Sequence, residues 1–247
     1  MEGGFYIYAI VGTAESTVLD VPGIDGNGEP VEMLPHGDIA AIVSRCQADR
    51  YDVARANMVA HQRVMEAAMA RWPILPVRFG TVADERQKIL DKLLLPRREE
   101  FRRLLDVMAG KVELGLKALW IDMQAIFAEI VEENPDIKAA RAGKRTNTTP
   151  ADGVRLGEMV KNALEQKKGK EARHILRHVD GQWCDRRLNE VFGDPMILNA
   201  SFLVERRREQ EFDQRVEALT NGANGRLRLK YVGPIPPCNF VEVVVTW

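Results

Sequence analysis

Two short apolar stretches, each broken by proline and glycine, constrain this chain more than any other feature of its sequence. The first is Leu75-Pro76-Val77-Arg78-Phe79-Gly80-Thr81, and the second is Gly233-Pro234-Ile235-Pro236-Pro237-Cys238-Asn239-Phe240. Proline fixes one backbone angle and lacks an amide hydrogen, whereas glycine permits turns that other residues avoid. Such segments specify backbone geometry, and neither gathers a nucleophile, an acid–base pair or a set of metal ligands. We therefore expect them to build a partner-binding surface. Its candidate residues are Leu75, Pro76, Val77, Arg78, Phe79, Gly80, Gly233, Pro234, Pro236, Pro237 and Phe240.

The length and composition are those of a globular chain with two domains. Its 247 residues are long for one domain, since domains usually contain about 100–150 residues. A net charge of −1 provides no general attraction to nucleic acid or to an acidic membrane surface. The first residues lack the features of a signal peptide, and no apolar run approaches the roughly 20 residues of a membrane span. The three cysteines are widely spaced, so we expect a reduced, cytoplasmic protein without a disulfide framework.

Residues 1–110 predict an α+β domain. The predicted elements are strands over 5–12 and 38–44, a helix over 53–71, an extended segment over 74–82, and a helix from 84 that is interrupted at Pro96. The strand over 5–12 is apolar on both faces, which is typical of a central strand. Beyond Pro96, apolar residues recur at helical spacing up to Met108, and Gly110 ends the helix.

Residues 111–247 predict a second domain of modified ferredoxin-like type. The predicted elements are strands over 111–119, 183–192, 196–204 and 226–232, helices over 122–133, 152–180 and 205–219, and a loop over 141–150. In the first strand Val112 and Leu114 alternate with Lys111 and Glu113, so the charged residues are expected on a solvent face. The order strand, helix, strand, strand, helix, strand is the ferredoxin-like pattern. A last strand over 240–247 is included in this domain but could pack on either one, and the fold class is α+β.

A pair of histidines is the nearest approach to a metal site. His174 and His178 are four residues apart on a predicted helix and could place two imidazoles on one face, as in some zinc sites. However, Arg173 and Arg177 beside them would repel a cation. We favour a solvated helix face and predict no metal site.

The remaining candidate chemistry has a structural explanation in each case. His36, Asp38 and Cys46 could form a Cys–His pair, but a turn that leads into a strand explains them better. His61 lies beside an apolar helix face and is expected to be a hydrogen-bonded structural residue. Arg78 interrupts an apolar stretch and is expected to pair with a carboxylate of a neighbouring helix, or to anchor a partner chain. No glycine-rich phosphate loop occurs, so we predict no cofactor.

Two basic runs raise the possibility of RNA binding, and the rest of the sequence argues against it. The runs are Arg206-Arg207-Arg208 and the segment from Lys167 to Arg173. RNA-binding sheets of this type need aromatic side chains on the central strands for base stacking, and the predicted strands lack such a pair. We therefore predict no nucleic-acid partner and no enzymatic activity.

The order of the motifs resembles the gas vesicle protein family GvpF/GvpL over nearly the whole chain. The matching features are an opening aromatic strand at 5–11, His61 with Val64 before the motif at 75–81, a strand ending in a basic residue at 111–117, a strand at 198–204 followed by a charged helix, and Gly-Pro-x-Pro-Pro-x-x-Phe at 233–240. The chain departs from the family pattern at Leu114, Ile235 and Cys238, where aromatic residues are usual.

The resemblance implies a minor, non-enzymatic gas vesicle protein that takes part in assembly or nucleation of the gas-filled shell. It implies binding to the main shell protein, GvpA, and to other gas vesicle proteins. The implied location is the gas vesicle in the cytoplasm, with the gas-facing side of the shell as one option. An N-terminal α+β domain and a modified ferredoxin-like domain are also implied. The alternative from another class is a ligand-sensing or regulatory module that uses the ferredoxin-like domain, which would need a concave pocket with converging polar groups.

Overall fold

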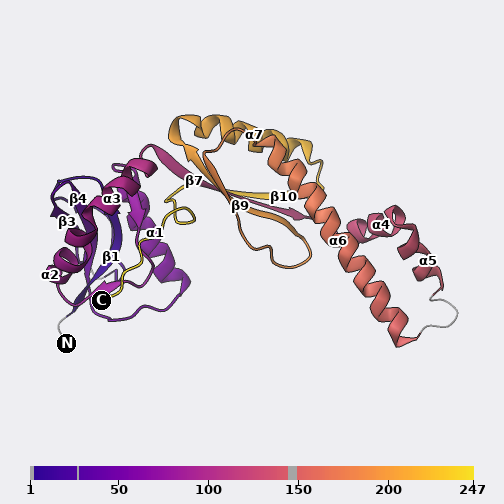
Figure 1. Cartoon of the computed structure of the whole chain (residues 1–247), viewed down its shortest axis with the longest axis horizontal. Helices are drawn as coiled ribbons and strands as arrows, with labels where there is room; N and C mark the ends of the chain where they lie inside the picture. The colour runs from indigo at the N-terminus through magenta and orange to yellow at the C-terminus, as the bar shows by residue number, and fades with distance from the viewer. Residues whose placement is uncertain (1–2, 27, 144–148) are drawn as a thin grey trace. The chain divides into compact units, whose positions relative to one another are not determined.

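The computed structural model describes residues 3–26, 28–143 and 149–247, and it is a mixed helix and sheet structure (Figure 1). The chain forms two compact units: the first contains residues 1–113 and 233–247, and the second contains residues 114–232. The expected boundary lay between residues 110 and 111, and the last fifteen residues belong to the first unit. That each unit folds as a separate domain stays a prediction. No helix in the described ranges is both long enough and apolar enough to cross a membrane.

The first unit is built on a six-stranded sheet in which β1 is central. The strands are β1 (Gly4–Val11), β2 (Val18–Leu19), β3 (Val31–His36), β4 (Ile39–Cys46), β5 (Ile74–Pro76) and β6 (Val82–Ala83). Their order is β2-β3-β4-β1-β5, and β6 also pairs with β1. Every residue of β1 is buried, which confirms the central strand predicted from its apolar sequence. The strand β3 was not predicted, because Pro35 lies within it and the turn at Gly37 follows directly.

The sheet lies between two helices (Figure 1). Helix α1 (Arg55–Met69) buries Val64 and Met65 against a core that includes Tyr6 and Tyr8 of β1. A β-bulge between Ile7 and Ala9 shifts the register of β1 against β4. The shift returns β1 to the same face after Tyr8, so Ala9 joins this core as well. Helix α3 (Leu95–Met108) packs against β4 and β5 with Phe101 and Leu105 buried.

The helix before α3 is continuous through Pro96, so the predicted interruption at this proline is wrong. Helix α2 (Arg86–Lys88) leads directly into a π-helical segment η1 (Ile89–Leu94), which leads directly into α3. Proline at the second position of α3 has no amide hydrogen to donate and would clash with a carbonyl one turn earlier. The wider π-helical turn immediately before it opens the backbone at this point.

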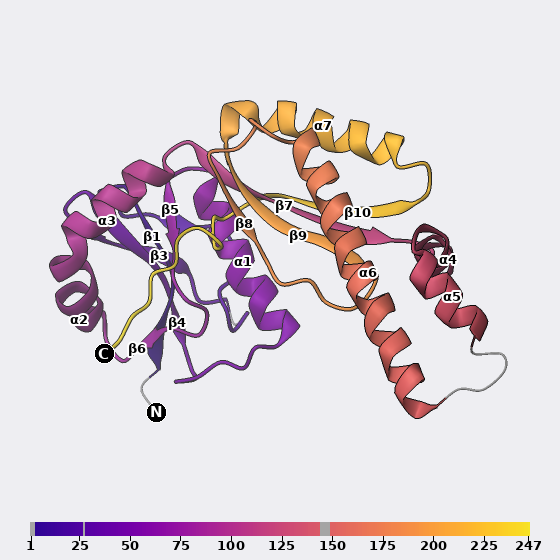
Figure 2. The same cartoon turned by 45° about the vertical axis from the view of Figure 1, so that its right-hand side comes forward.

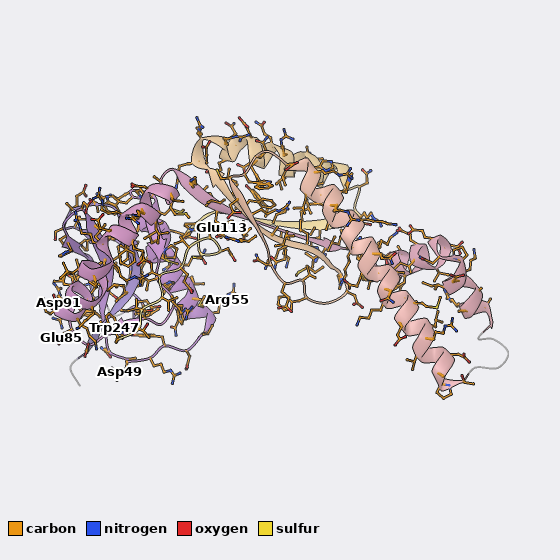
Figure 3. All side chains as sticks on the ribbon, in the orientation of Figure 1. Asp49, Arg55, Glu85, Asp91, Glu113 and Trp247 are labelled. Carbon is orange, nitrogen blue, oxygen red and sulfur yellow. The ribbon has the colours of Figure 1, made fainter. Side chains whose placement is uncertain are left out.

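The predicted last strand over 240–247 is also wrong. The segment makes one isolated parallel bridge, between Val77 and Val243. Its two backbone hydrogen bonds run from Arg78 N to Val243 O, at 3.0 Å, and from Val243 N to Pro76 O, at 2.8 Å. The pairing stops there because the chain turns after Arg78, whose carbonyl accepts from Thr81. Further along, the Trp247 indole donates to the Val82 carbonyl at 2.8 Å, close to the labelled end of the chain in Figure 3.

The second unit contains a four-stranded sheet with the order β10-β7-β9-β8. Its strands are β7 (Lys111–Trp120), β8 (Asp185–Leu188), β9 (Met196–Glu205) and β10 (Leu227–Ile235), and the first residues of β7 and the last of β10 belong to the first unit. The helices are α4 (Met123–Glu133), α5 (Pro135–Gly143), α6 (Pro150–His178) and α7 (Glu209–Gly222), with a 3-10 turn η2 (Arg206–Arg208) before α7. The order of strands and main helices is the predicted ferredoxin-like one, and α4 and α5 are the additions that modify it (Figure 2). Of the predicted loop over 141–150, residues 141–143 are helical and 144–148 lie outside the described residues.

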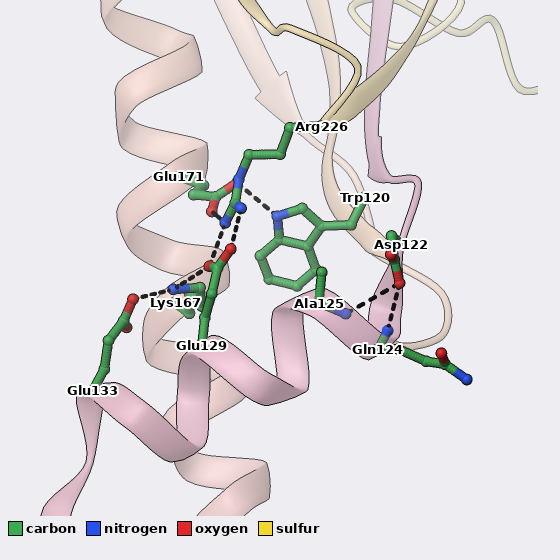
Figure 4. Close-up of polar contacts among 9 residues, drawn as sticks. All are labelled: Trp120, Asp122, Gln124, Ala125, Glu129, Glu133, Lys167, Glu171 and Arg226. Atoms are coloured by element: carbon green, nitrogen blue, oxygen red, sulfur yellow. Dashed lines mark hydrogen bonds and ion pairs between the residues drawn. The ribbon is translucent and has the colours of Figure 1, made fainter.

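A polar network joins α4, α6 and the start of β10 within the second unit (Figure 4). Arg226 donates to both carboxylate oxygens of Glu129, at 2.5 and 2.8 Å, and to Glu171 at 2.6 Å. Glu171 also accepts from the Trp120 indole at 2.6 Å, and Lys167 pairs with Glu129 at 3.0 Å. The Asp122 side chain caps α4 by accepting from the backbone of the next turn. These charged residues therefore hold two helices and the start of a strand together.

Candidate functional site

The two proline-rich motifs meet at one groove in the first unit. This groove, which we call the α1 groove, has a volume of about 290 Å³ and is lined by α1, by the segment after β5, by Glu113 and by the C-terminal segment. Figure 2 shows the C-terminal segment passing beside α1 and β5. Its lining residues are Met58, His61, Gln62, Met65, Pro76, Val77, Phe79, Glu113, Ile235, Pro236, Cys238, Asn239 and Glu242.

Helix α1 contributes one stripe of side chains to the α1 groove. Met58, His61, Gln62 and Met65 follow the spacing i, i+3, i+4, i+7, which places them on the same helix face. Met58 is 40% exposed, whereas Met65 is buried. Sequence reasoning identified a different stripe through Val64 and missed these methionines. The signal that could have found them is the second apolar stripe, since two stripes on one helix indicate a second surface to cover.

His61 forms the polar floor of the α1 groove. Its Nδ1 lies 3.0 Å from the Tyr6 hydroxyl, which in turn accepts from the Gly80 amide at 3.0 Å. Burial lowers the pKa of His61 to about 4, and a hydrogen bond to the Val77 backbone opposes this shift. The imidazole is therefore neutral near pH 7. Its Nδ1 accepts a hydrogen bond from the Tyr6 hydroxyl, and its other nitrogen donates a hydrogen bond to the Val77 backbone. The expected structural role of His61 is confirmed.

The first motif, residues 75–81, contributes a core residue, part of the wall of the α1 groove and a tight turn. Leu75 is fully buried in the core, and Pro76 and Val77 lie at the wall of the α1 groove. The half-buried Phe79 ring stands 5.6 Å from the His61 ring, edge to face. Gly80 has a φ of +81°, which only glycine adopts freely, and this turn aims its amide at Tyr6.

Arg78 is not buried, which corrects the expected pairing with a helix. Its guanidinium donates to the Glu242 carboxylate through Nε at 3.1 Å and Nη2 at 2.8 Å, and its side chain is 56% exposed. Glu242 belongs to the C-terminal segment. The ion pair thus joins the two motifs at the rim of the α1 groove.

The second motif forms the opposite wall. Pro236 lines the α1 groove, Pro237 is buried, and Gly233 and Pro234 precede them through a cis peptide bond. After Pro237 the chain turns, with the Phe240 amide donating to the Pro237 carbonyl at 3.0 Å. Phe240 is half-buried and does not line the α1 groove.

Glu113 anchors this turn, which contradicts its expected position on a solvent face. It is 1% exposed, and its carboxylate accepts from the Asn239 backbone at 2.9 Å and from the Asn239 side chain at 2.5 Å. The physical reason is that the C-terminal segment covers this face of β7. A carboxylate in an alternating strand carries no signal of such a partner, because Asn239 lies far away in the sequence. Figure 3 labels Glu113 next to this segment.

The other candidate residues are not assembled into a reactive site. Asp38 pairs with Arg98 at 2.7 Å and Arg102 at 2.8 Å, and Cys46 is buried, with the pKa of its thiol raised by that burial. The rings of His174 and His178 stand 4.6 Å apart on the exposed side of α6. Within residues 3–26, 28–143 and 149–247, no group of three or more His, Cys, Asp or Glu is placed to hold a metal ion.

The arrangement of the α1 groove suits the binding of an apolar segment. Its walls carry methionine, proline, valine and phenylalanine, and Asn239 and His61 already have hydrogen-bond partners within the protein. Apolar walls with a few fixed polar groups are typical of sites that bury a partner's side chains.

Comparison with known proteins identifies the family. The family model described as "Gas vesicle synthesis protein GvpL/GvpF" matches residues 4–242. Gas vesicle protein F of Streptomyces sp. is 31% identical over 240 residues, covering 96% of this chain and 99% of that protein. Gas vesicle protein F of Microcystis aeruginosa is 26% identical over 251 residues, covering 99% of this chain and 100% of that protein.

Solved structures show the same fold. The crystal structure of GvpF from Anabaena sp. PCC7120 superposes with a TM-score of 0.86 at 24% identity, covering 98% of this chain and 99% of that one. The crystal structure of GvpF from Microcystis aeruginosa gives a TM-score of 0.83 at 25% identity, covering 97% and 99%. The predicted α+β class and the resemblance drawn from the motifs are confirmed. On the match over residues 4–242 and the 31% identity to a full-length relative, this chain belongs to the GvpL/GvpF family of gas vesicle synthesis proteins.

Proposed function

We propose that this protein acts in assembly or nucleation of the gas vesicle shell by binding the main shell protein, GvpA, through the α1 groove. The observation that carries the proposal is the convergence of the two motifs, one near residue 77 and the other near residue 237, on one apolar groove. Family membership supports a gas vesicle role and association with other gas vesicle proteins, and GvpL/GvpF is not a known enzyme family.

The physical need for such a partner follows from what the shell does. A subunit that keeps water out of a gas space must carry a large apolar face, which exposes it to aggregation before assembly. A protein that covers part of this face would lower that risk. Methionine suits the task because its flexible, polarisable side chain adapts to different apolar surfaces. Met58 and Met65 line the α1 groove together with the aromatic ring of Phe79.

A charge placed in the α1 groove tests the proposal. In Met58→Glu, a carboxylate replaces a side chain that is 40% exposed, so the fold should persist while apolar contact is lost. Val107→Glu is the matched control, because Val107 is 52% exposed in the same unit and does not line the groove. We expect M58E to weaken association with GvpA about tenfold or more when the two proteins are co-expressed and co-purified, as for loss of one buried apolar anchor. Equal binding by M58E and V107E would count against the groove as the site.

The location in the vesicle needs a separate test. We propose that the protein is retained on the gas-facing side of the shell, where protease cannot reach it. Intact vesicles are floated, washed with denaturant and treated with protease before and after collapse by pressure. The expected result is a chain that survives in intact vesicles and is cleaved after collapse. Cleavage in both states would place it on the outer surface, and loss in the wash would restrict its role to assembly.

A further inference from the structure

The second unit contains a basic cavity that the proposed function does not use. It lies where the last turns of α6 meet β8 and has a volume of about 620 Å³. Four basic side chains line it, namely Lys170, Arg173, Arg177 and Arg186, together with Trp183 and one acidic residue, Asp180. We call this surface the α6 basic groove.

The basic side chains of the α6 basic groove differ from their neighbours on α6 in having no acidic partner. Lys167 pairs with Glu129 at 3.0 Å and with Glu133 at 2.6 Å, and Lys168 pairs with Glu165 at 3.3 Å. Among the residues that the structure describes, none of the four groove cations forms an ion pair within 4.0 Å, with Asp180 or with any other carboxylate. Positive charge therefore accumulates on one surface, where it can attract an anionic partner.

The spacing of the charges favours an extended partner over a single small anion. Lys170, Arg173 and Arg177 follow i, i+3, i+7 along α6, and with a rise of about 1.5 Å per residue this row spans about 10 Å. A single phosphate is shorter than this row, so an extended partner can use more of its charges. In an extended chain, side chains on one face recur about every 6.6–6.8 Å, so two or three carboxylates would fit the row.

The aromatic side chain in the α6 basic groove argues against RNA. Trp183 is half-buried, and the Arg186 guanidinium lies over its ring at 5.0 Å from the centroid. One face of the ring is thus occupied, and it holds Arg186 in place for a bidentate contact with a carboxylate. Base stacking needs open aromatic faces, and no second aromatic side chain lines this groove in the described part of the chain.

From these observations we infer that the α6 basic groove binds an extended acidic segment of a partner protein. The partner is recognised by carboxylates spaced along its chain, with Lys170, Arg173 and Arg177 on one side and Arg186 on the other. This surface belongs to the second unit and uses charge, so the inference does not rest on GvpA binding at the α1 groove.

The test uses the full chain and a fluorescein-labelled peptide in which six glutamates alternate with glycines. Fluorescence anisotropy gives its affinity, and the same peptide with glutamine in place of glutamate is the uncharged control. The paired variant is Arg173→Glu with Arg177→Glu. Its matched control is Arg155→Glu with Lys161→Glu, which makes the same charge change at exposed positions of α6 outside the groove.

We expect binding of the glutamate peptide, weak binding of the glutamine peptide, and a loss of about tenfold or more in R173E/R177E alone, because reversing groove charges turns attraction into repulsion. Equal losses in R173E/R177E and R155E/K161E would overturn the inference, since general charge attraction would then explain binding. Tighter binding of a single-stranded RNA of equal charge, or of tripolyphosphate, would overturn it in favour of nucleic acid or of a small-anion sensor. If R173E/R177E fails to fold, R173Q/R177Q serves instead. We expect its affinity for the glutamate peptide to be lower than that of wild type, with a smaller loss than for the charge-reversed variant.

Discussion

His61 shows how a single side chain can set the acid sensitivity of the first unit. It is a buried neutral imidazole between Tyr6 and the Val77 backbone, and its pKa in the folded state lies at about 4 against an ordinary value of 6.5. Between these two pH values the unfolded chain binds a proton that the folded chain excludes. Its stabilising effect is therefore complete above pH 6.5 and is lost as the pH falls towards 4.

Replacing His61 with glutamine should remove this pH dependence. From the shift in pKa, lowering the pH from 7 to 5 should cost the wild type about 2 kcal/mol of unfolding free energy through His61 alone. H61Q is expected to be less stable at pH 7, because it loses packing and hydrogen bonds, yet to decline less between pH 7 and pH 5. Urea unfolding at both pH values gives the change in unfolding free energy between pH 7 and pH 5 for each protein. An equal change in H61Q and wild type would contradict the assignment.

At the residue scale, the sequence predicts a role where local chemistry decides it. His61 beside an apolar helix face was predicted correctly, because a buried histidine needs a hydrogen-bond partner wherever the helix packs. Glu113 and Arg78 were placed wrongly, because their partners, Asn239 and Glu242, lie more than a hundred residues away. A contact between segments far apart in the chain does not change the spacing of apolar and polar residues in either segment, so the sequence pattern does not reveal it.

At the scale of elements, the Arg226 network fixes α4 and α6 against the start of β10. A guanidinium can donate to two carboxylates in a plane, which an ammonium group cannot reproduce. Hydrogen bonds from Arg226 lower the pKa of Glu129 to about 2, and Lys167 adds to this effect. The network is partly exposed, so water weakens it relative to a buried ion pair.

Arg226→Lys should therefore destabilise the second unit almost as much as Arg226→Ala, by roughly 1–2 kcal/mol in each case. Arg228→Ala is the matched control, since Arg228 is an exposed basic residue two positions further along β10. Thermal unfolding of the three variants gives the comparison. If R226K were as stable as wild type, a positive charge alone, without the planar guanidinium, would be enough to hold α4, α6 and β10 together.

The lowered pKa of Glu129 predicts how the stability of the second unit changes in acidic solution. Because its pKa is lowered from 4.5 to about 2, its contribution to stability is present above pH 4.5 and is lost as the pH falls towards 2. In Glu129→Gln the unfolding free energy should change less over this range than in wild type. Chemical denaturation at pH 5 and pH 3 tests this, and an unchanged wild-type-like decline in E129Q would refute it.

The elements that were predicted well are those whose sequence decides their environment. β1 is apolar on both faces and is buried on both, and the order of strands and main helices in the second unit follows from alternating and helical periodicities. The helix through Pro96 and the segment over 240–247 were predicted wrongly. In the first case a π-helical turn absorbs the proline, and in the second a three-residue β5 offers too short an edge for a strand to pair with.

At the scale of the whole molecule, the chain leaves the first unit after Glu113 and returns to it at Gly233. The returning segment supplies buried residues, Val241 and Val243 among them, and one wall of the α1 groove. The two motifs of the candidate site could be predicted from the sequence, but their contact in one groove could not. Proline and glycine indicate where the chain turns, but they do not indicate which distant residues the turn packs against.

Truncation tests this division of the chain. Removing residues 233–247 should destabilise the first unit strongly, because core residues lose their cover, whereas a fragment of residues 114–232 should keep a cooperative thermal transition. Circular dichroism melting of the truncated chain, the fragment and the full chain gives the comparison. A truncated chain that melts like the full chain would contradict the assignment of the C-terminal segment to the first unit.

The return of the C-terminal segment ties partner binding to the order of protein synthesis. A ribosome releases the sheet of the first unit early, then all of the second unit, and only then the residues from Ile235 to Glu242 that close the α1 groove. Domains usually fold as they emerge, but here the first unit is incomplete until residues 233–247 have been synthesised. A chain stalled within its second unit therefore presents no finished groove, and only translated chains that have passed residue 242 can engage a partner there.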